Sequence, residues 1–191
     1  TKSPPPPCAA GRRIPYPPGT GTCHYEMELV VALAASGFRV AQADALPLVF
    51  GYACGLDLTR RDLQNAAKEK RYPWDTGKDF ENAAVIGSIT RAAEFGAPHA
   101  QRISLTQNGT VKQEADLSEM IWSVAGLIAD LSCMYHLAPG DLIYTGTPAG
   151  VLQRLQRPPQ LPLDADAGVS GGQPLGGLGR DIAAQQSFAG L

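Results

Sequence analysis

The chain has 191 residues, of which 44% are hydrophobic and 18% charged, and its formal net charge is −2. These values are typical of one soluble globular domain that is long enough to bury a hydrophobic core. The charge gives no electrostatic case for nucleic acid, and no apolar run reaches the ~18 residues of a membrane span. We therefore expect a small-molecule partner, no nucleic acid and no membrane.

The first half of the chain predicts two strands with helices after them. Residues 1–22 are rich in Pro and Gly and indicate an extended N-terminal segment. A strand is predicted at 24–33, where β-favouring residues lie between two glycines. A short helix is then predicted at 44–51, a second strand at 51–59 and a polar helix at 60–71.

The second half predicts a hairpin, a long helix and a short strand. The hairpin covers 103–114 and turns at Asn108-Gly109. The helix covers 118–136, with Ser118 as its N-cap and a run of apolar residues at helical spacing. Its apolar residues are Met120, Ile121, Val124, Leu127, Ile128, Leu131 and Met134. A strand follows at 142–145, and we see no sustained pattern beyond Leu152.

Two acidic residues stand out on the first strand. Glu26 and Glu28 are two residues apart, so they share one face of the strand with the apolar Val30 and Ala32. Close carboxylates beside apolar surface repel each other and lose hydration, which favours either a shared proton or a bound cation. A hard divalent cation suits such oxygens. The alternative is an edge strand whose polar side faces water.

A third acid, Asp57, alternates with Leu56 and Leu58 on the next strand. If the two strands pair suitably, it joins Glu26 and Glu28, and three carboxylates with remaining water positions make a site for Mg²⁺ or Mn²⁺. The alternative for Asp57 is a turn residue at the end of its strand.

Several spaced motifs resemble the fumarylacetoacetate hydrolase family. The strand at 24–31 reads HYEMELVV and resembles the family's H-x-E-x-E-L strand. Further blocks follow in the family's order, and the resemblance extends from about residue 14 to residue 151. They are GYACGLDLTRRDLQ at 51–64, PWDTGKDF at 73–80, NG at 108–109, Gln113, MI at 120–121, LAPGD at 137–141 and TGTPAGV at 145–151. Within the family, the Pro-Trp block and the Leu-Thr-x-Arg-Asp run resemble the fumarylpyruvate hydrolase and acylpyruvase branch.

The resemblance implies a role for each candidate residue. Glu26, Glu28 and Asp57 are expected to hold Mg²⁺ or Mn²⁺, and the catalytic Lys78 to bind and polarise the substrate beside the metal. The side chains expected to line the substrate pocket are Arg61, Gln64 and Thr147. Without the motifs, Lys78 is an ordinary surface lysine, Arg61 and Gln64 are the outer face of a helix, and Thr147 is a plain turn residue.

The resemblance also implies a fold and an activity. The fold is α+β, a mixed β-sandwich roll with peripheral helices, commonly assembled as a homodimer. The activity is metal-dependent hydrolysis of the C–C bond of an acylpyruvate, a 2,4-dioxo acid, with fumarylpyruvate giving fumarate and pyruvate in aromatic-acid breakdown. An oxaloacetate decarboxylase or tautomerase on the same scaffold, or a catalytically dead metal-binding homologue, are the alternatives.

Two departures from the family pattern define the expected organisation. Related enzymes carry a water-activating His and Glu upstream of the E-x-E strand, whereas residues 1–22 hold neither, so no general base is assigned and the lid is expected to be missing. We expect a metal-binding core at 23–151 and a divergent Pro/Gly-rich tail at 152–191 that packs poorly. The four scattered cysteines and the lack of a signal-peptide pattern favour a cytoplasmic protein.

Overall fold

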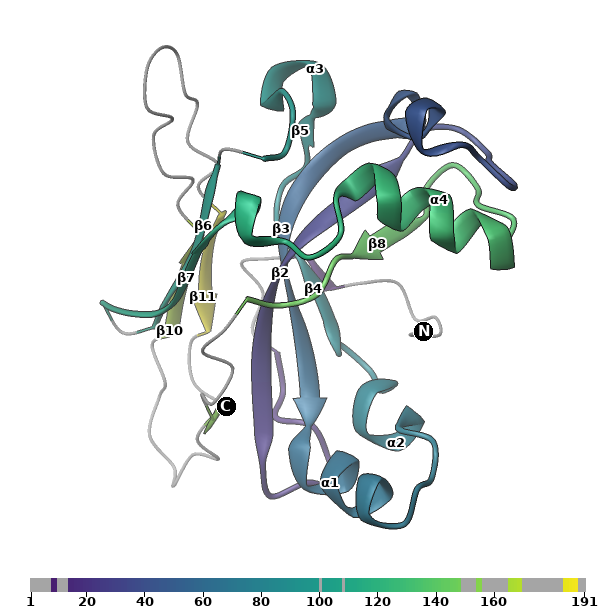
Figure 1. The fold of residues 1–191 in the computed structure, drawn as a ribbon. Coiled ribbons are helices and arrows are strands. Elements are labelled where there is room, and N and C mark those ends of the chain that lie inside the picture. Colours follow the sequence, from purple (N-terminus) through teal and green to yellow (C-terminus); the bar gives the residue numbers. More distant parts are fainter. Residues whose placement is uncertain are drawn as a thin grey trace.

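The fold is built on two long antiparallel strands, β2 (Cys23–Leu33) and β3 (Val49–Arg60), which curve through the centre of the molecule (Figure 1). The structure is a computed structural model. It describes residues 8–9, 14–99, 101–107 and 109–148, and the backbone of 154–155, 165–169 and 184–188. The pairing of β2 and β3 runs from Cys23 opposite Arg60 to Leu33 opposite Val49. Both strands were predicted, but the prediction begins one residue late for β2, and for β3 it begins two residues late and ends one residue early.

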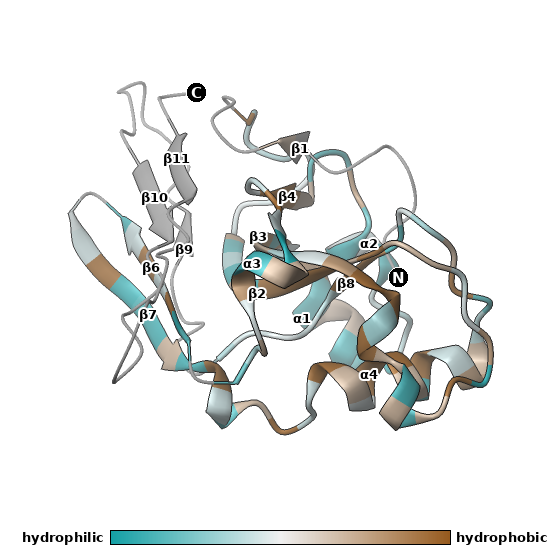
Figure 2. Ribbon diagram, turned by 90° about the horizontal axis from the view of Figure 1, so that it is seen from above, coloured by the Kyte–Doolittle hydropathy of each residue, from teal (hydrophilic) through white to brown (hydrophobic). Residues whose placement is uncertain are grey.

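Shorter strands extend this pair into the first sheet, whose main order is β1-β4-β3-β2-β8. In addition, β5 pairs with β3 and β9 pairs with β2. The bounds of the shorter strands are Cys8–Ala9 for β1, Ala84–Ile86 for β4, Thr90–Arg91 for β5, Leu142–Tyr144 for β8 and Arg154–Leu155 for β9. Figure 2 shows apolar residues concentrated along β2 and β8, whereas α1 is mainly hydrophilic.

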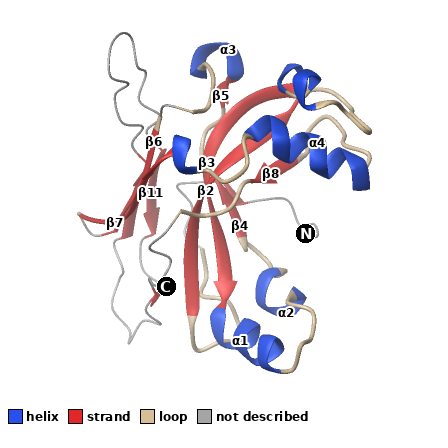
Figure 3. Cartoon of the chain, viewed as in Figure 1, coloured by secondary structure: helices blue, strands red, loops and turns tan. Residues whose placement is uncertain are grey.

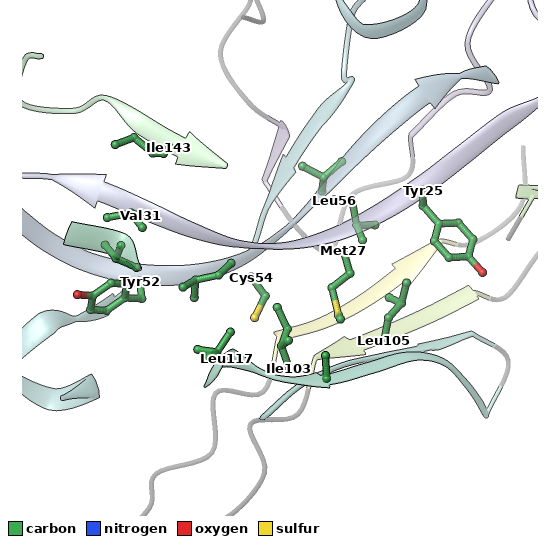
Figure 4. Close-up of a cluster of buried hydrophobic side chains, with 14 of the residues drawn as sticks. Tyr25, Met27, Val31, Tyr52, Cys54, Leu56, Ile103, Leu105, Leu117 and Ile143 are labelled. Carbon is green, nitrogen blue, oxygen red and sulfur yellow. The ribbon is translucent and has the colours of Figure 1, made fainter. Parts of the chain in front are cut away.

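A second sheet, in the order β11-β10-β6-β7, stands beside the first (Figure 1). Its strands are β6 (Arg102–Gln107), β7 (Thr110–Asp116), β10 (Ala165–Val169) and β11 (Ala184–Phe188). Tyr25 and Met27 of β2 pack against Ile103 and Leu105 of β6 between the sheets (Figure 4). Because side chains alternate along a strand, the same alternation turns Glu26 and Glu28 away from this core.

The helices lie around the sheets, as Figure 3 shows. Their bounds are Arg61–Glu69 for α1, Asp75–Lys78 for α2, Ala92–Phe95 for α3 and Val124–Met134 for α4, with single 3₁₀ turns at Gln42–Asp44, Leu46–Leu48 and Leu117–Glu119. The predicted α+β architecture of sheets with peripheral helices is confirmed. Among the described residues, none of the helices combines the length and apolar character that crossing a bilayer requires.

The prediction of one helix over 118–136 was wrong at its start. The chain makes a 3₁₀ turn ending at Glu119, whose carboxylate accepts a hydrogen bond from the Asp116 backbone N–H. The chain is then extended at Met120, and Ile121 is 96% exposed. The helix α4 begins only after Ser123, whose hydroxyl accepts from the Gly126 N–H. The local cap therefore outweighs the apolar periodicity that we extended through Ile121.

Two other predictions differ from the structure. The short helix expected at 44–51 is replaced by two 3₁₀ turns, Gln42–Asp44 and Leu46–Leu48, because β3 already begins at Val49. Beyond Leu152 the sequence predicted no element, yet β9 pairs with β2 and β10 pairs with β6. Most of 152–191 lies outside the described residues, so the expectation that this tail packs poorly stays a prediction. The division of the chain into segments at residues 22 and 151 likewise stays a prediction. Asn108 of the predicted hairpin turn also lies outside the described residues.

Candidate metal centre

Three carboxylates meet on the face of β2 and β3 that lies opposite the inter-sheet core. Glu26 is directly opposite Asp57 in the strand register, and Glu28 is two residues farther along β2. One oxygen from each of the three groups lies within 4.8 Å of the others. Glu28 is only 5% exposed and Glu26 is also buried, so these acids do not form a solvated surface cluster. The water-facing edge strand that we considered as an alternative is therefore wrong for Glu26 and Glu28.

The space beside Glu28 depends on a glycine. Gly55 is opposite Glu28 in the register. A Cβ atom at this position would lie 2.6 Å from a methyl group of Val30 and 2.8 Å from both the Tyr144 ring and the Val85 carbonyl oxygen. Such distances are far inside van der Waals contact, so the Tyr144 ring and the β4 backbone can lie this close to β3 only with glycine at position 55.

Two basic side chains reach the carboxylates from the helices that follow β3. The Lys78 ammonium, at the end of α2, donates to Glu26 Oε2 and, at 2.9 Å, to Asp57 Oδ2. Arg61, the first residue of α1, donates from Nη2 to Glu26 Oε1 and from Nη1 to Gln64 Oε1. The prediction that Lys78 lies beside the acids is confirmed as a placement, while its catalytic role stays a prediction.

Close packing of α1 and α2 places these bases. Gly77 is buried next to Lys78, and a Cβ atom there would lie 3.0 Å from the Gln64 Cβ and 3.1 Å from the Gln64 backbone. Gln64 itself is buried, so it does not lie on the outer face of its helix. The pocket-lining roles expected for Arg61 and Gln64 remain predictions, since their observed partners are within the chain.

The charges of the bases decide the ionisation of Glu26. Burial disfavours its charged form, but the hydrogen bonds and charges of Lys78 and Arg61 outweigh burial and hold the pKa of Glu26 below its ordinary value. Burial likewise disfavours the ammonium of Lys78, yet Asp57 and Glu26 raise the pKa of Lys78 above its ordinary value. Both groups are therefore charged at neutral pH.

Glu28 behaves in the opposite way. Burial, followed by the negative charge of Asp57, raises the pKa of Glu28 to about 7, although the Gly146 backbone N–H donates to Glu28 Oε2 at 2.9 Å. Burial, followed by the negative charges of Glu28 and Asp57, also raises the pKa of Tyr144. The Tyr144 hydroxyl donates to the Val85 carbonyl oxygen at 3.0 Å. A carboxylate that is this costly to ionise gains strongly from a nearby cation.

The turn that carries Thr147 is attached to β2 and to β7. Thr145 donates from both its backbone N–H, at 3.1 Å, and its hydroxyl, at 3.0 Å, to the Leu29 carbonyl oxygen. Thr147 accepts a hydrogen bond from Gln113 Nε2 at 3.0 Å. The turn reaches the carboxylates through the Gly146 N–H, so Thr147 is placed next to the site, and its contact with substrate stays a prediction.

The three carboxylates fit a divalent ion. Ligands on opposite sides of an octahedral Mg²⁺ are about 4 Å apart, which is close to the spread of these oxygens. Carboxylate oxygens are hard ligands that suit Mg²⁺ and Mn²⁺. The residues that would hold the ion are Glu26, Glu28 and Asp57, and three ligands leave further positions open for a substrate. The donor set therefore fits the metal that the sequence predicts.

The comparisons with known proteins identify the family. Residues 5–181 match the family described as fumarylacetoacetate (FAA) hydrolase, C-terminal. This chain belongs to the fumarylacetoacetate hydrolase family. The predicted resemblance and the fold that it implies are thereby confirmed.

Individual members of the fumarylacetoacetate hydrolase family are similar over most of this chain. A fumarylpyruvate hydrolase from Ralstonia sp. is 51% identical over 155 residues, which cover 79% of this chain and 78% of that protein. A mitochondrial oxaloacetate tautomerase from Rattus norvegicus is 41% identical over 128 residues, which cover 67% of this chain and 58% of that protein. The chain thus spans less than two thirds of the rat protein.

Solved structures of the fumarylacetoacetate hydrolase family share this fold. The crystal structure of fumarylpyruvate hydrolase from Pseudomonas aeruginosa in complex with Mn²⁺ and pyruvate superposes with a TM-score of 0.75 at 40% identity, over 87% of this chain and 68% of that one. The crystal structure of a fumarylpyruvate hydrolase candidate from Burkholderia cenocepacia superposes with a TM-score of 0.76 at 40% identity. This superposition covers 96% of the present chain and 73% of the Burkholderia chain.

Sequence reasoning missed three contributors to the site. Gln113 was quoted only as part of a motif, and Gly146 and Tyr144 were given no role. Nothing in their local pattern predicts these contacts, because each one joins elements far apart in the sequence. The two histidines downstream of the first strand, His99 and His136, are both exposed, and His136 stacks on Phe38 with ring centroids 3.9 Å apart.

Proposed function

We propose that this chain is a divalent-metal-dependent hydrolase that cleaves the C–C bond of an acylpyruvate, with fumarylpyruvate giving fumarate and pyruvate. The observation that carries the proposal is the convergence of the buried carboxylates of Glu26 and Glu28 with the half-buried carboxylate of Asp57, each offering an oxygen within 4.8 Å of the others, with the Lys78 ammonium on two of the three groups. The similarity to the Ralstonia sp. fumarylpyruvate hydrolase, 51% identical, supports the substrate.

The metal is proposed to be Mg²⁺ or Mn²⁺. The Pseudomonas aeruginosa neighbour was solved with Mn²⁺ and pyruvate, which supports a divalent ion beside the pyruvate moiety. When bound, the ion would act as a Lewis acid on the chelating oxygens of a 2,4-dioxo acid. The carboxylates of Glu26, Glu28 and Asp57 would hold it, and the burial of Glu26 and Glu28 limits the access of bulk water to these two ligands.

The basic residues supply the remaining positive charge. Water adds to the distal carbonyl carbon, the C–C bond breaks, and its electron pair moves to the pyruvate fragment as an enolate that is then protonated. Lys78 and Arg61 would hold fixed positive charge where this negative charge develops, and such preorganised charge lowers the barrier. The charges of Asp57 and Glu26 outweigh burial and raise the pKa of Lys78, so its ammonium is protonated at neutral pH before substrate binds. We name no residue as the general base that activates the water.

The substrate contacts follow from the same geometry. Arg61 keeps further N–H groups beyond those given to Glu26 and Gln64, because a guanidinium has five. These would bind a carboxylate of the dioxo acid. Gln64 would orient Arg61 through the hydrogen bond from Nη1. Thr147, beside Glu28, would donate its hydroxyl to a substrate carboxylate or oxo group.

Oxaloacetate tautomerisation or decarboxylation is the second candidate activity. It is favoured by the rat oxaloacetate tautomerase, 41% identical to this chain. These reactions share the enolate and the metal, but they need no attacking water. The higher identity of the fumarylpyruvate hydrolase makes hydrolysis the first choice.

The experiment compares both substrates with the purified chain and with Mn²⁺ or Mg²⁺. Pyruvate release from fumarylpyruvate is measured by coupling to lactate dehydrogenase, and enol–keto conversion of oxaloacetate by ultraviolet absorbance. We expect fumarylpyruvate to have the higher kcat/KM, and Glu26→Gln to lower it at least about 100-fold. The exposed Glu69→Gln on α1 is the matched control. A higher kcat/KM for oxaloacetate would replace hydrolysis with the second candidate, and metal binding without any turnover would indicate a catalytically dead homologue.

The cellular setting is part of the same proposal. We propose a homodimer in the cytoplasm that acts in aromatic-compound catabolism, with a small dioxo acid as its partner and neither nucleic acid nor membrane. No disulfide links the described cysteines Cys23, Cys54 and Cys133, which supports a reducing compartment. Light scattering after size exclusion tests the dimer, since a monomeric mass would exclude it.

A further inference from the structure

The amide of Gln113 bridges two segments next to Glu28, namely β2 at the preceding residue, Met27, and the turn whose Gly146 N–H contacts Glu28. Gln113 is on β7 of the second sheet and is only 3% exposed. Its Oε1 accepts from the Met27 backbone N–H at 3.0 Å, and its Nε2 donates to Thr147 Oγ1 at 3.0 Å and to the Pro148 carbonyl oxygen at 3.5 Å. One side chain thus connects the strand between the two glutamates to the turn after β8.

This bridge fills a gap in the hydrogen bonding of β2. The described partners on that edge of β2 are β8, opposite Val30 to Ala32, and β9, opposite Cys23 and His24. Met27 lies between these two pairings, and its N–H is satisfied by the Gln113 side chain instead of a strand. Leaving a buried N–H without an acceptor is unfavourable, so this contact holds the amide of Gln113 in place.

The Met27 contact also decides which way the amide faces. A backbone N–H can only donate, so the atom facing Met27 must be the amide oxygen. The amide nitrogen therefore faces Thr147, and because an amide N–H can only donate, the Thr147 hydroxyl oxygen must accept there. The single O–H of Thr147 is then left to donate elsewhere.

We propose that Gln113 is a positioning residue that holds the Thr147 hydroxyl as a hydrogen-bond donor beside the metal centre. The inference rests on the proposed function. Its consequence is chemical: the substrate group that meets Thr147 must be an acceptor, such as a carboxylate or oxo oxygen, and a hydroxyl or protonated acid would be bound less well. Gln113 itself touches neither the substrate nor the metal.

The test is a double-mutant cycle with pyruvate as the probe, read by calorimetry in the presence of saturating Mn²⁺. The four proteins are the wild type, Gln113→Met, Thr147→Val and the double variant. We expect Gln113→Met to weaken pyruvate binding about 3- to 10-fold in the wild type and less than about 2-fold in Thr147→Val, because its effect passes through the hydroxyl. In a protein that carries Thr147→Ser, adding Gln113→Met should again weaken pyruvate binding about 3- to 10-fold, because serine keeps the hydroxyl.

Two controls separate positioning from general damage. Gln107→Met on the neighbouring strand removes a side chain that also joins the sheets, where Gln107 Oε1 accepts from the Tyr25 hydroxyl at 3.1 Å. It should leave pyruvate affinity unchanged. The Mn²⁺ affinity of Gln113→Met should stay within about threefold of wild type. If Gln113→Met does not fold, Gln113→Glu replaces it, because a carboxylate still accepts from Met27 but cannot donate to Thr147.

Each outcome decides between distinct conclusions. The positioning role of Gln113 would be overturned if its substitution weakened pyruvate binding equally with and without the Thr147 hydroxyl. A parallel loss of Mn²⁺ affinity would overturn it as well. Either result leaves the proposed function intact if the wild type still cleaves an acylpyruvate. A wild type that binds Mn²⁺ but neither binds pyruvate nor turns over an acylpyruvate would overturn the proposed function, and this assignment with it.

Discussion

Replacing Glu28 with glutamine should stabilise the metal-free protein at pH 8 and remove much of its pH dependence. The pKa of Glu28 is raised from an ordinary value of 4.5 to about 7 by burial and by Asp57. Between these two pH values the folded state keeps a proton that the unfolded state has lost. The free energy of unfolding therefore falls as the pH rises from about 4.5, and the full cost is present above pH 7.

The size of the effect follows from the shift. At 1.36 kcal/mol for each pKa unit, the shift of Glu28 corresponds to about 3 kcal/mol. At about 2–4 °C for each kcal/mol in a chain of this length, that is a difference of about 6–12 °C in Tm. Glutamine has nearly the same shape and can still accept the hydrogen bond from the Gly146 N–H, so little else should change.

The assay is thermal unfolding at pH 5, 6, 7 and 8, first with a chelator and then with Mn²⁺. Without metal, the Tm of Glu28→Gln should rise relative to wild type as the pH increases, while Glu69→Gln, exposed on α1, should follow the wild type. Mn²⁺ at about 100 times its Kd should add about 2.7 kcal/mol to the wild type at pH 8 and less to Glu28→Gln. Parallel pH curves for the wild type and Glu28→Gln would refute the reasoning.

Further predictions concern the other contacts of the site. Lys78→Met should lower kcat at least about 100-fold with Mn²⁺ still bound, measured by pyruvate release, whereas Lys68→Met on the exposed side of α1 should not change it. Gly55→Ala should destabilise the fold by about 1–3 kcal/mol in urea unfolding, because its Cβ would lie 2.6 Å from Val30; an unchanged midpoint would mean that the strands can separate there. Away from the site, the Asp62 carboxylate on α1 accepts from the Thr20 hydroxyl and from the Gly21 and Leu63 backbone N–H groups. Asp62→Ala should therefore cost about 1–3 kcal/mol in the same assay, and a neutral result would assign those contacts no net stability.

The sequence predicted the parts of the site that depend on alternation along one strand. Glu26 and Glu28 share a face because side chains repeat every two residues, and this holds in any sheet. The pairing of Glu26 with Asp57 depends instead on the register of β2 and β3, which are joined by a 15-residue connection. Such a connection sets no fixed register, so the family motifs were needed to place Asp57.

The sequence could not predict contacts between the sheets. Gln113 has no local signal that separates it from other polar residues on an alternating strand. Its importance arises only when β7 packs beside β2 and meets Met27 and Thr147. The helix start was missed for a different reason, because Ser118 and Ser123 are both acceptable N-caps and only the extended backbone at Met120 decides between them.

The central claim is that Glu26, Glu28 and Asp57 share one divalent ion. Anomalous scattering from crystals soaked in Mn²⁺ measures this directly. The account predicts one manganese peak about 2.1 Å from an oxygen of each of the three carboxylates, with the Lys78 ammonium displaced from at least one of them. A peak at other residues, or active crystals with no manganese between the three carboxylates, would contradict it.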